Sequence, residues 1–157
     1  MSNLRIVNTP DEEMKALTRM DSKTTAVVNK TKFPDAVTKT SFVKDSTASI
    51  KLTAYEPNYL KYISNNANEG LAIFSEMYYA EGWNAYIDGK LTPHFEADYA
   101  LRGLKVPAGK HTVEFKFEPQ VIKTGSTIAL VSFILMLGLI GFGIYTDRKK
   151  KSEETVK

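Results

Sequence analysis

The distribution of apolar residues divides the chain into two parts with different patterns. Residues 128–145, IALVSFILMLGLIGFGIY, form a run of eighteen residues without a charge. As a helix this run would be ~27 Å long, close to the ~30 Å hydrocarbon core of a bilayer. A core helix in so small a protein would rarely be apolar on every face. The pattern therefore predicts one C-terminal transmembrane helix over residues 128–146.

The sequence before this run shows the alternation that is typical of strands. Apolar and polar residues alternate over 49–55 and again over 111–118. Further short strands are expected at 59–64, 71–74, 83–87 and 90–95. About seven or eight short strands separated by turns predict a mainly β protein, with an antiparallel, jelly-roll-like β-sandwich over residues 23–119.

Two predicted turns contain residues that readily adopt positive φ. Asp88-Gly89 is the strongest hairpin signal in the chain, because a type I′ turn needs positive φ at both central residues. Gly109 supplies the same freedom in a later turn. Asp88, Gly89 and Gly109 are therefore predicted to be structural turn residues.

The first 22 residues form a leading segment with a short helix. Thr9 can cap this helix, Pro10 suits its first position, and Glu12 completes a capping box. Residues 23–28 are expected to be the first strand of the sandwich. Residues 120–127 are expected to be a juxtamembrane linker.

Charge changes the picture mainly at the C-terminus. The chain has a formal net charge of +3, and the near-neutral domain offers no electrostatic reason to expect nucleic acid as a partner. The cluster Arg148–Lys151 follows the apolar run after Thr146 and Asp147. By the positive-inside rule it predicts a cytoplasmic tail, residues 147–157, and a domain on the other side of the lipid bilayer.

Export of the domain needs an explanation. The N-terminal stretch MSNLRIVNTPDEEMK has no apolar segment that could act as a signal peptide. Either the last helix translocates its own N-terminus, or the chain is the end of a longer polytopic protein, which we favour. There is no cysteine, so disulfides cannot indicate the redox compartment.

Three motifs in order carry a family resemblance. They are the hairpin YYAEGWNAYIDGK at 78–90, YALRGLKVPAGKH at 99–111, and VEFKFEP at 113–119, followed by the apolar run. Over about residues 48–150 the chain resembles the C-terminus of YfhO-family bacterial membrane proteins. The resemblance implies a place in the bacterial inner membrane.

The resemblance also implies a function. Family members are long polytopic proteins of the GT-C glycosyltransferase type, thought to transfer sugars from a lipid-linked donor to cell-envelope polymers. Their catalytic residues lie in early loops, which this chain lacks, so no catalytic residue, metal or cofactor is carried over. The chain alone is expected to be a non-catalytic module that assists assembly or acceptor handling, with other transmembrane helices of a larger protein or complex as partners.

A second hypothesis is a stand-alone glycan-binding module. Tyrosines are frequent in the β region, and exposed rings could stack on sugars, although most are expected in the core or its rim. Trp83 alternates in phase with Ala85 and is expected inside, whereas Tyr86 is expected outside. Tyr79, Tyr86 and Arg102 are the candidate glycan contacts, and Arg102 could instead hold a carboxylate inside the domain.

A third hypothesis, a serine acyltransferase, has little support. Residues 41–44 match S-x-x-K and residues 123–125 match K-T-G. The serine lies in a polar loop, however, and K-T-G lies at the membrane boundary. The two histidines, His94 and His111, have no short-spaced partner that would indicate a metal site.

Overall fold

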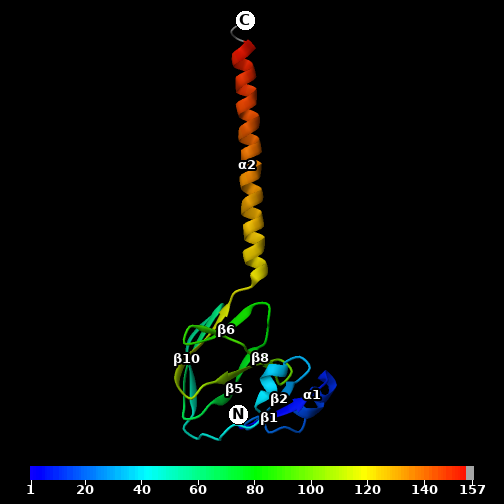
Figure 1. Ribbon diagram of the computed structural model, residues 1–157, viewed down its shortest axis with the longest axis vertical. Coiled ribbons are helices and arrows are strands. Elements are labelled where there is room, and N and C mark those ends of the chain that lie inside the picture. Colours follow the sequence, from blue (N-terminus) through cyan, green and yellow to red (C-terminus); the bar gives the residue numbers. More distant parts are fainter. Residues whose placement is uncertain (155–157) are drawn as a thin grey trace. The chain divides into compact units, whose positions relative to one another are not determined.

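The computed structural model describes residues 1–154, with side chains described for residues 1–145. The chain divides into two compact units, Met1–Glu118 and Pro119–Lys157. The prediction of antiparallel sheets, a short N-terminal helix and one C-terminal apolar helix is confirmed. Figure 1 shows the strands gathered in the first unit and the single helix α2 in the second.

The first unit contains three sheets. Their strands are β1 (Asn3–Val7), β2 (Thr25–Asn29), β3 (Ser49–Glu56), β4 (Tyr59–Asn66), β5 (Gly70–Met77), β6 (Trp83–Ile87), β7 (Lys90–Thr92), β8 (Phe95–Ala97), β9 (Leu101–Val106) and β10 (Gly109–Phe117). A five-stranded sheet has the order β3-β4-β10-β6-β7, and a three-stranded sheet has the order β5-β9-β8. Both are antiparallel, whereas β1 and β2 form a separate parallel pair.

The three-stranded sheet is packed on both faces. One face meets the five-stranded sheet in a core cluster that includes Leu104, Val113 and Phe115, all three with no exposed surface. The other face meets the N-terminal strands in a second cluster, where Leu71 and Phe95 pack against residues such as Val28. The fold therefore has three layers rather than the two of a simple sandwich.

The N-terminal layer differs from the sequence prediction. Strand β1 was not predicted, and β2 pairs with β1 instead of joining the sandwich. Helix α1 (Pro10–Leu17) connects the two, which gives the βαβ connection that parallel neighbours require. The 3-10 helix η1 (Pro34–Thr38) follows β2. Figure 1 shows β1, β2 and α1 lying side by side.

The predicted cap of α1 is present. The Thr9 Oγ1 accepts a hydrogen bond from the Glu12 amide at 3.3 Å. The Glu12 carboxylate accepts one from the Asn8 amide at 2.9 Å, one residue earlier than in an ideal capping box. These bonds satisfy amides that would otherwise lack partners at the helix start.

One loop joins the N-terminal layer to the three-stranded sheet. The Asp98 carboxylate accepts a hydrogen bond from the Val27 amide at 2.7 Å, and the Tyr99 amide donates to Glu13 Oε1 at 2.9 Å. Glu13 is fully buried, and its Oε2 has no hydrogen-bond partner among the residues whose side chains are described. Burial therefore raises the pKa of the Glu13 carboxyl.

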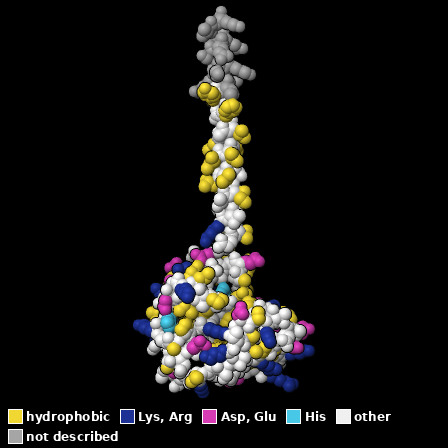
Figure 2. Space-filling view, viewed as in Figure 1, with side chains coloured by type: hydrophobic (Ala, Val, Ile, Leu, Met, Phe, Trp, Pro, Cys, Tyr) yellow, Lys and Arg dark blue, Asp and Glu magenta, His cyan; other side chains and the backbone are white. Residues whose placement is uncertain are grey.

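The second unit is dominated by one helix, α2 (Gln120–Glu154). It begins at Gln120, so residues 120–127, expected as a linker, form its first turns. Its stretch Gln120–Tyr145 is long and apolar enough to cross a membrane, and none of it is buried against protein. Figure 2 shows apolar side chains along this helix. Of the expected tail, residues 155–157 lie outside the described residues.

Candidate functional site

Three aromatic rings form a partly exposed cluster where β10 ends. We call Tyr79, Trp83 and Phe117 the aromatic platform. The rings of Tyr79 and Phe117 stack with centroids 6.5 Å apart, and the Trp83 and Phe117 centroids are 5.3 Å apart. Tyr79 is 49% exposed and Phe117 is 38% exposed. This is the arrangement in which protein rings can meet a flat, partly apolar ligand.

The backbone of the loop holds the platform in place. The Trp83 amide donates to the Tyr79 carbonyl at 3.1 Å, and the Glu118 amide donates to the Gly82 carbonyl at 2.6 Å. A Cβ atom on Gly82 would lie 2.3 Å from the Phe117 ring and 2.7 Å from the Tyr79 ring. Gly82 is therefore needed for the close approach of these two rings.

Arg102 lies beneath the platform rather than on the surface. Its guanidinium carbon is 4.6 Å from the Trp83 ring centroid and 4.7 Å from that of Phe115. Its Nε and Nη2 both donate to the Met77 carbonyl, at 3.2 and 2.9 Å. Two aromatic faces thus stabilise the buried cation through their quadrupoles.

This position corrects the sequence interpretation of Arg102. The residue is 1% exposed, so a surface glycan does not reach it. Among the described residues no carboxylate forms an ion pair with it. Its Nη1 group has no hydrogen-bond partner within residues 1–145, and burial lowers the pKa of the guanidinium. The sequence offered no signal for this role, because the rings come from distant strands.

Tyr86 lies on the opposite face of the five-stranded sheet from the platform. In the β6–β10 register Trp83 faces Phe117, whereas Tyr86 faces Glu114. Its hydroxyl donates to Glu118 Oε2 at 2.7 Å, and Lys116 Nζ lies 4.8 Å from the ring centroid. The structure therefore brings Tyr79 and Trp83 together but keeps Tyr86 apart from them.

The turn residues have the backbone that their sequence favours. Asp88 and Gly89 have φ of 51° and 77°, and Gly109 has φ of 114°. Asp88 also contacts β10, because its carboxylate lies 2.6 Å from His111 Nδ1 and accepts a bond from the Thr112 amide at 2.8 Å. The Asp88 carboxylate raises the pKa of His111 and is itself held at a lowered pKa.

His94 is largely buried next to the arginine. Its ring centroid lies 5.1 Å from that of Tyr78 and 6.1 Å from that of Phe115, and its Nε2 has no hydrogen-bond partner in the part of the chain with described side chains. Burial, with a smaller effect of the Arg102 charge, lowers the pKa of His94 to about 4. Within the described part of the chain, no three His, Cys, Asp or Glu side chains are grouped to hold a metal.

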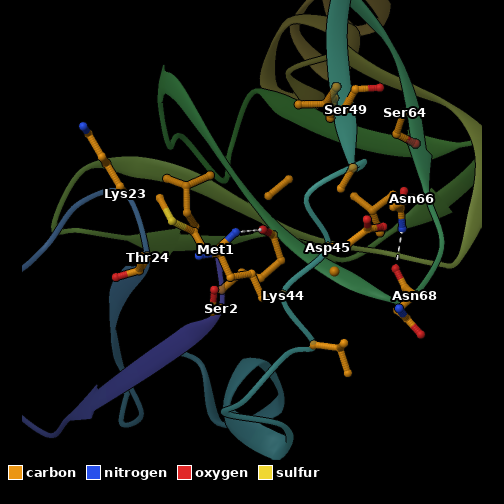
Figure 3. A pocket seen from close by; sticks show the side chains of 18 of the residues that line it. Met1, Ser2, Lys23, Thr24, Lys44, Asp45, Ser49, Ser64, Asn66 and Asn68 are labelled. Atoms are coloured by element: carbon orange, nitrogen blue, oxygen red, sulfur yellow. Dashed lines mark hydrogen bonds between the residues drawn. The ribbon is translucent and has the colours of Figure 1, made fainter.

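A second candidate site is a groove of about 520 Å³ between the inner side of β3–β4 and the edge of β5. Figure 3 shows Met1, Asp45 and Asn66 entering it from three separate segments. The Met1 amine donates to the Leu71 carbonyl at 2.9 Å. Of the groove residues, the sequence analysis pointed only to Val43 and Lys44, through the S-x-x-K match, since the others meet only through the fold.

The polar groups of this groove are mostly occupied by the protein itself. Asp45 accepts bonds from the amides of Thr47 and Ala67, both at 2.8 Å. The Asn66 amide group donates to the carbonyls of Asn68 and Pro107, at 2.6 and 2.7 Å. These bonds fix loops, so the groove has fewer free polar groups for a ligand than its outline suggests.

A β domain joined through Glu118 and Pro119 to an apolar helix long enough to span a bilayer defines the class of protein: a membrane protein with a folded polar domain. The family described as bacterial membrane protein YfhO matches residues 15–129, which is most of the chain. This chain belongs to the YfhO family, as its three motifs indicated.

One curated relative shows how small a part of a family member the chain represents. A 72-residue stretch is 35% identical to the uncharacterized protein YfhO of Bacillus subtilis (strain 168). That stretch covers 46% of this chain and 8% of the relative. No solved structure matches the chain.

Proposed function

We propose that this chain is a non-catalytic, membrane-anchored module that works on the outer side of the cytoplasmic membrane. It would assist the assembly or acceptor handling of a GT-C type envelope glycosyltransferase of the YfhO family. The tail would lie in the cytoplasm, and other transmembrane helices of the same or a partner polypeptide would be neighbours of α2.

One observation carries this proposal. The family match covers residues 15–129, which include most of the folded domain and the first turns of α2, and this supports the domain as a part of YfhO-family proteins. The apolar helix supplies attachment to the bilayer. The domain supplies a rigid surface, because the side chains of its core, among them Leu104, Val113 and Phe115, are fully buried.

A complementation experiment tests the proposed role. In Bacillus subtilis, the stretch of YfhO that aligns with this chain would be deleted, and the sugar content of purified envelope polymers measured. We expect a loss as large as that of a complete yfhO deletion, and recovery when the full chain is supplied in trans.

Two results would contradict the proposal. The first is normal envelope sugar after deletion of the aligned stretch. The second is recovery of the sugar in the complete deletion strain by this chain alone, since that would make it catalytic. A chain lacking residues 120–157 serves as the control for anchoring.

A second candidate function, glycan binding, is favoured by the partly exposed stacked rings of the aromatic platform. Of the predicted glycan contacts, Tyr79 fits best, because its ring is partly exposed. Tyr86 is a separate candidate on the other face of the sheet. Arg102 is not a candidate contact, because it is buried. Trp83 is the single tryptophan of the chain and lies against Phe117, so it reports on this site.

Fluorescence titration tests the glycan contact. Envelope polysaccharide added to the full chain in detergent should change the Trp83 emission, and Tyr79→Ala should weaken the apparent affinity about tenfold, as for one stacking ring. Tyr99→Ala, at an exposed tyrosine outside the platform, is the matched control. An unchanged Trp83 spectrum at saturating polysaccharide would remove this candidate.

A further inference from the structure

Strand β3 is an edge strand with an uncovered apolar face. It is the terminal strand of the five-stranded sheet, and among the described residues it pairs only with β4. In that register Leu52 lies opposite Tyr62 and Tyr55 opposite Leu60. Residues directly opposite each other share a sheet face, so Leu52 and Tyr55 point to the same side as the buried Tyr62 and Leu60.

This side is the core side, but Leu52 and Tyr55 of β3 remain exposed on it. Tyr62 is 9% and Leu60 2% exposed, whereas Leu52 is 49% and Tyr55 68% exposed. The three-stranded sheet has two strands fewer than the five-stranded one, and the inner-face side chains of Leu52 and Tyr55 on β3 are left exposed. An edge with free backbone groups and an open apolar face is a site for another strand.

The sequence of β3 fits a second copy of itself. Antiparallel pairing around a two-fold axis between Thr53 and Ala54 places Lys51 opposite Glu56 of the other copy. The same register places Leu52 opposite Tyr55. Opposite charges and apolar pairs at directly opposed positions are the combinations that stabilise antiparallel neighbours.

A β-bulge in β3 places the two residues of each proposed pair on the same face of the sheet. The register of β3 against β4 shifts between Leu52 and Ala54, so Thr53 is the extra residue. Because of this shift, Lys51 and Glu56 lie together on the outer face while Leu52 and Tyr55 lie together on the inner face. A regular strand would put one member of each pair on the wrong side.

Both charged residues are available for the partner. Lys51 and Glu56 are exposed, and neither forms an ion pair within the described residues. A lysine and a bulge on an edge strand discourage pairing with unmatched strands. The matched register turns the same two features into complementary contacts.

We propose that β3 is a self-association site, through which two copies of this chain form a two-fold symmetric dimer by antiparallel β3–β3 pairing. The interface is isologous, so each Lys51–Glu56 and Leu52–Tyr55 contact occurs twice. This inference does not depend on the proposed function, because it concerns only the folded domain.

Charge reversal tests the register. Sedimentation of the full chain in detergent should show a dimer whose dissociation constant rises about tenfold in Lys51→Glu and in Glu56→Lys, because each change creates two like-charge contacts. The double variant Lys51→Glu/Glu56→Lys should regain wild-type dimerisation. Lys110→Glu, an exposed charge reversal outside β3, is the matched control.

Disulfide trapping gives a second measurement in native membranes. The chain has no cysteine, and positions 51 and 56 are too far apart along one strand to bridge within a copy. Oxidation of Lys51→Cys/Glu56→Cys with copper phenanthroline should therefore give a covalent dimer. A monomeric wild-type chain, or a dimer indifferent to both single reversals, would overturn the proposal. A dimer that is indifferent to both reversals would mean that the two copies associate through the helix or through another face of the domain.

Discussion

The domain and the helix use the same apolar residue types in opposite ways. Leu104 and Phe115 of the domain have no exposed surface, whereas Leu139 and Phe142 of α2 are 74% and 66% exposed. Each such side chain left in water forgoes roughly 1.5–3 kcal/mol of burial free energy. The domain therefore provides its own apolar environment, while the helix requires one from lipid or from other helices.

The largest expected effect comes from charging the helix. The double change Ile134→Arg/Leu137→Arg should cost about 6 kcal/mol of insertion free energy, at roughly 3 kcal/mol for each arginine at a membrane centre. We expect the protein to be lost from the alkali-resistant membrane fraction. Met77→Arg/Leu91→Arg, at exposed apolar residues of the domain, should leave that fraction unchanged. Equal retention of both variants would remove the distinction between the two regions.

The next effect comes from emptying the domain core. Phe115→Ala should reduce the free energy of unfolding of the domain by about 3–5 kcal/mol, since a fully buried ring leaves a cavity. Urea unfolding in detergent, followed by Trp83 fluorescence, measures this change. Phe142→Ala is the matched control, and a comparable loss there would mean that the domain and helix do not unfold independently.

A smaller effect tests the packing on the second face of the three-stranded sheet. A Cβ atom on Gly103 would lie 2.4 Å from the Phe95 ring, whereas one on Gly70 would have its nearest neighbour at 4.0 Å. Gly103→Ala should therefore cost about 2 kcal/mol through overpacking, and Gly70→Ala clearly less. Equal urea midpoints for the two variants would show that the second core cluster accommodates the added methyl group at little cost in stability.

The smallest effect concerns the buried acid of α1. Glu13→Gln should raise the free energy of unfolding by about 1 kcal/mol at pH 7, because it removes a buried charge with one unpartnered oxygen. The folded-state pKa of Glu13 is raised above 4.5, so the wild type loses stability as pH rises through that folded value. The difference between the two proteins should shrink as pH falls toward 4.5. A constant difference from pH 4 to pH 8 would contradict this role.

The sequence was informative where local chemistry decides the structure. The Asp88-Gly89 turn, the alternation in β10 and the apolar run of α2 each depend on neighbouring residues, and they predicted the sheets and the single apolar helix. The start of α2 was harder to place. Residues 120–127 are mostly polar, and only the continuous backbone shows that they are helical.

The missed elements depend on contacts between distant residues. Strand β9 contains Gly103, which breaks its apolar alternation, and it forms because Phe95 fills the space that this glycine leaves. From its sequence Arg102 could be a glycan contact or the partner of an internal carboxylate, yet in the structure the rings of Trp83 and Phe115 enclose it. Of the predicted glycan contacts, only Tyr79 has a ring in a partly exposed aromatic cluster. A single sequence does not show which aromatic rings come into contact in the folded domain.

The most direct test of the account is the side of the membrane on which the domain lies. Because the chain has no cysteine, Lys90→Cys at the exposed start of β7 and Ser152→Cys in the tail can each be probed alone in spheroplasts with a membrane-impermeant maleimide. The account predicts immediate labelling at position 90 and labelling at position 152 only after the membrane is opened. The reverse pattern, or labelling of both before the membrane is opened, would contradict a domain held outside by a helix that crosses the bilayer.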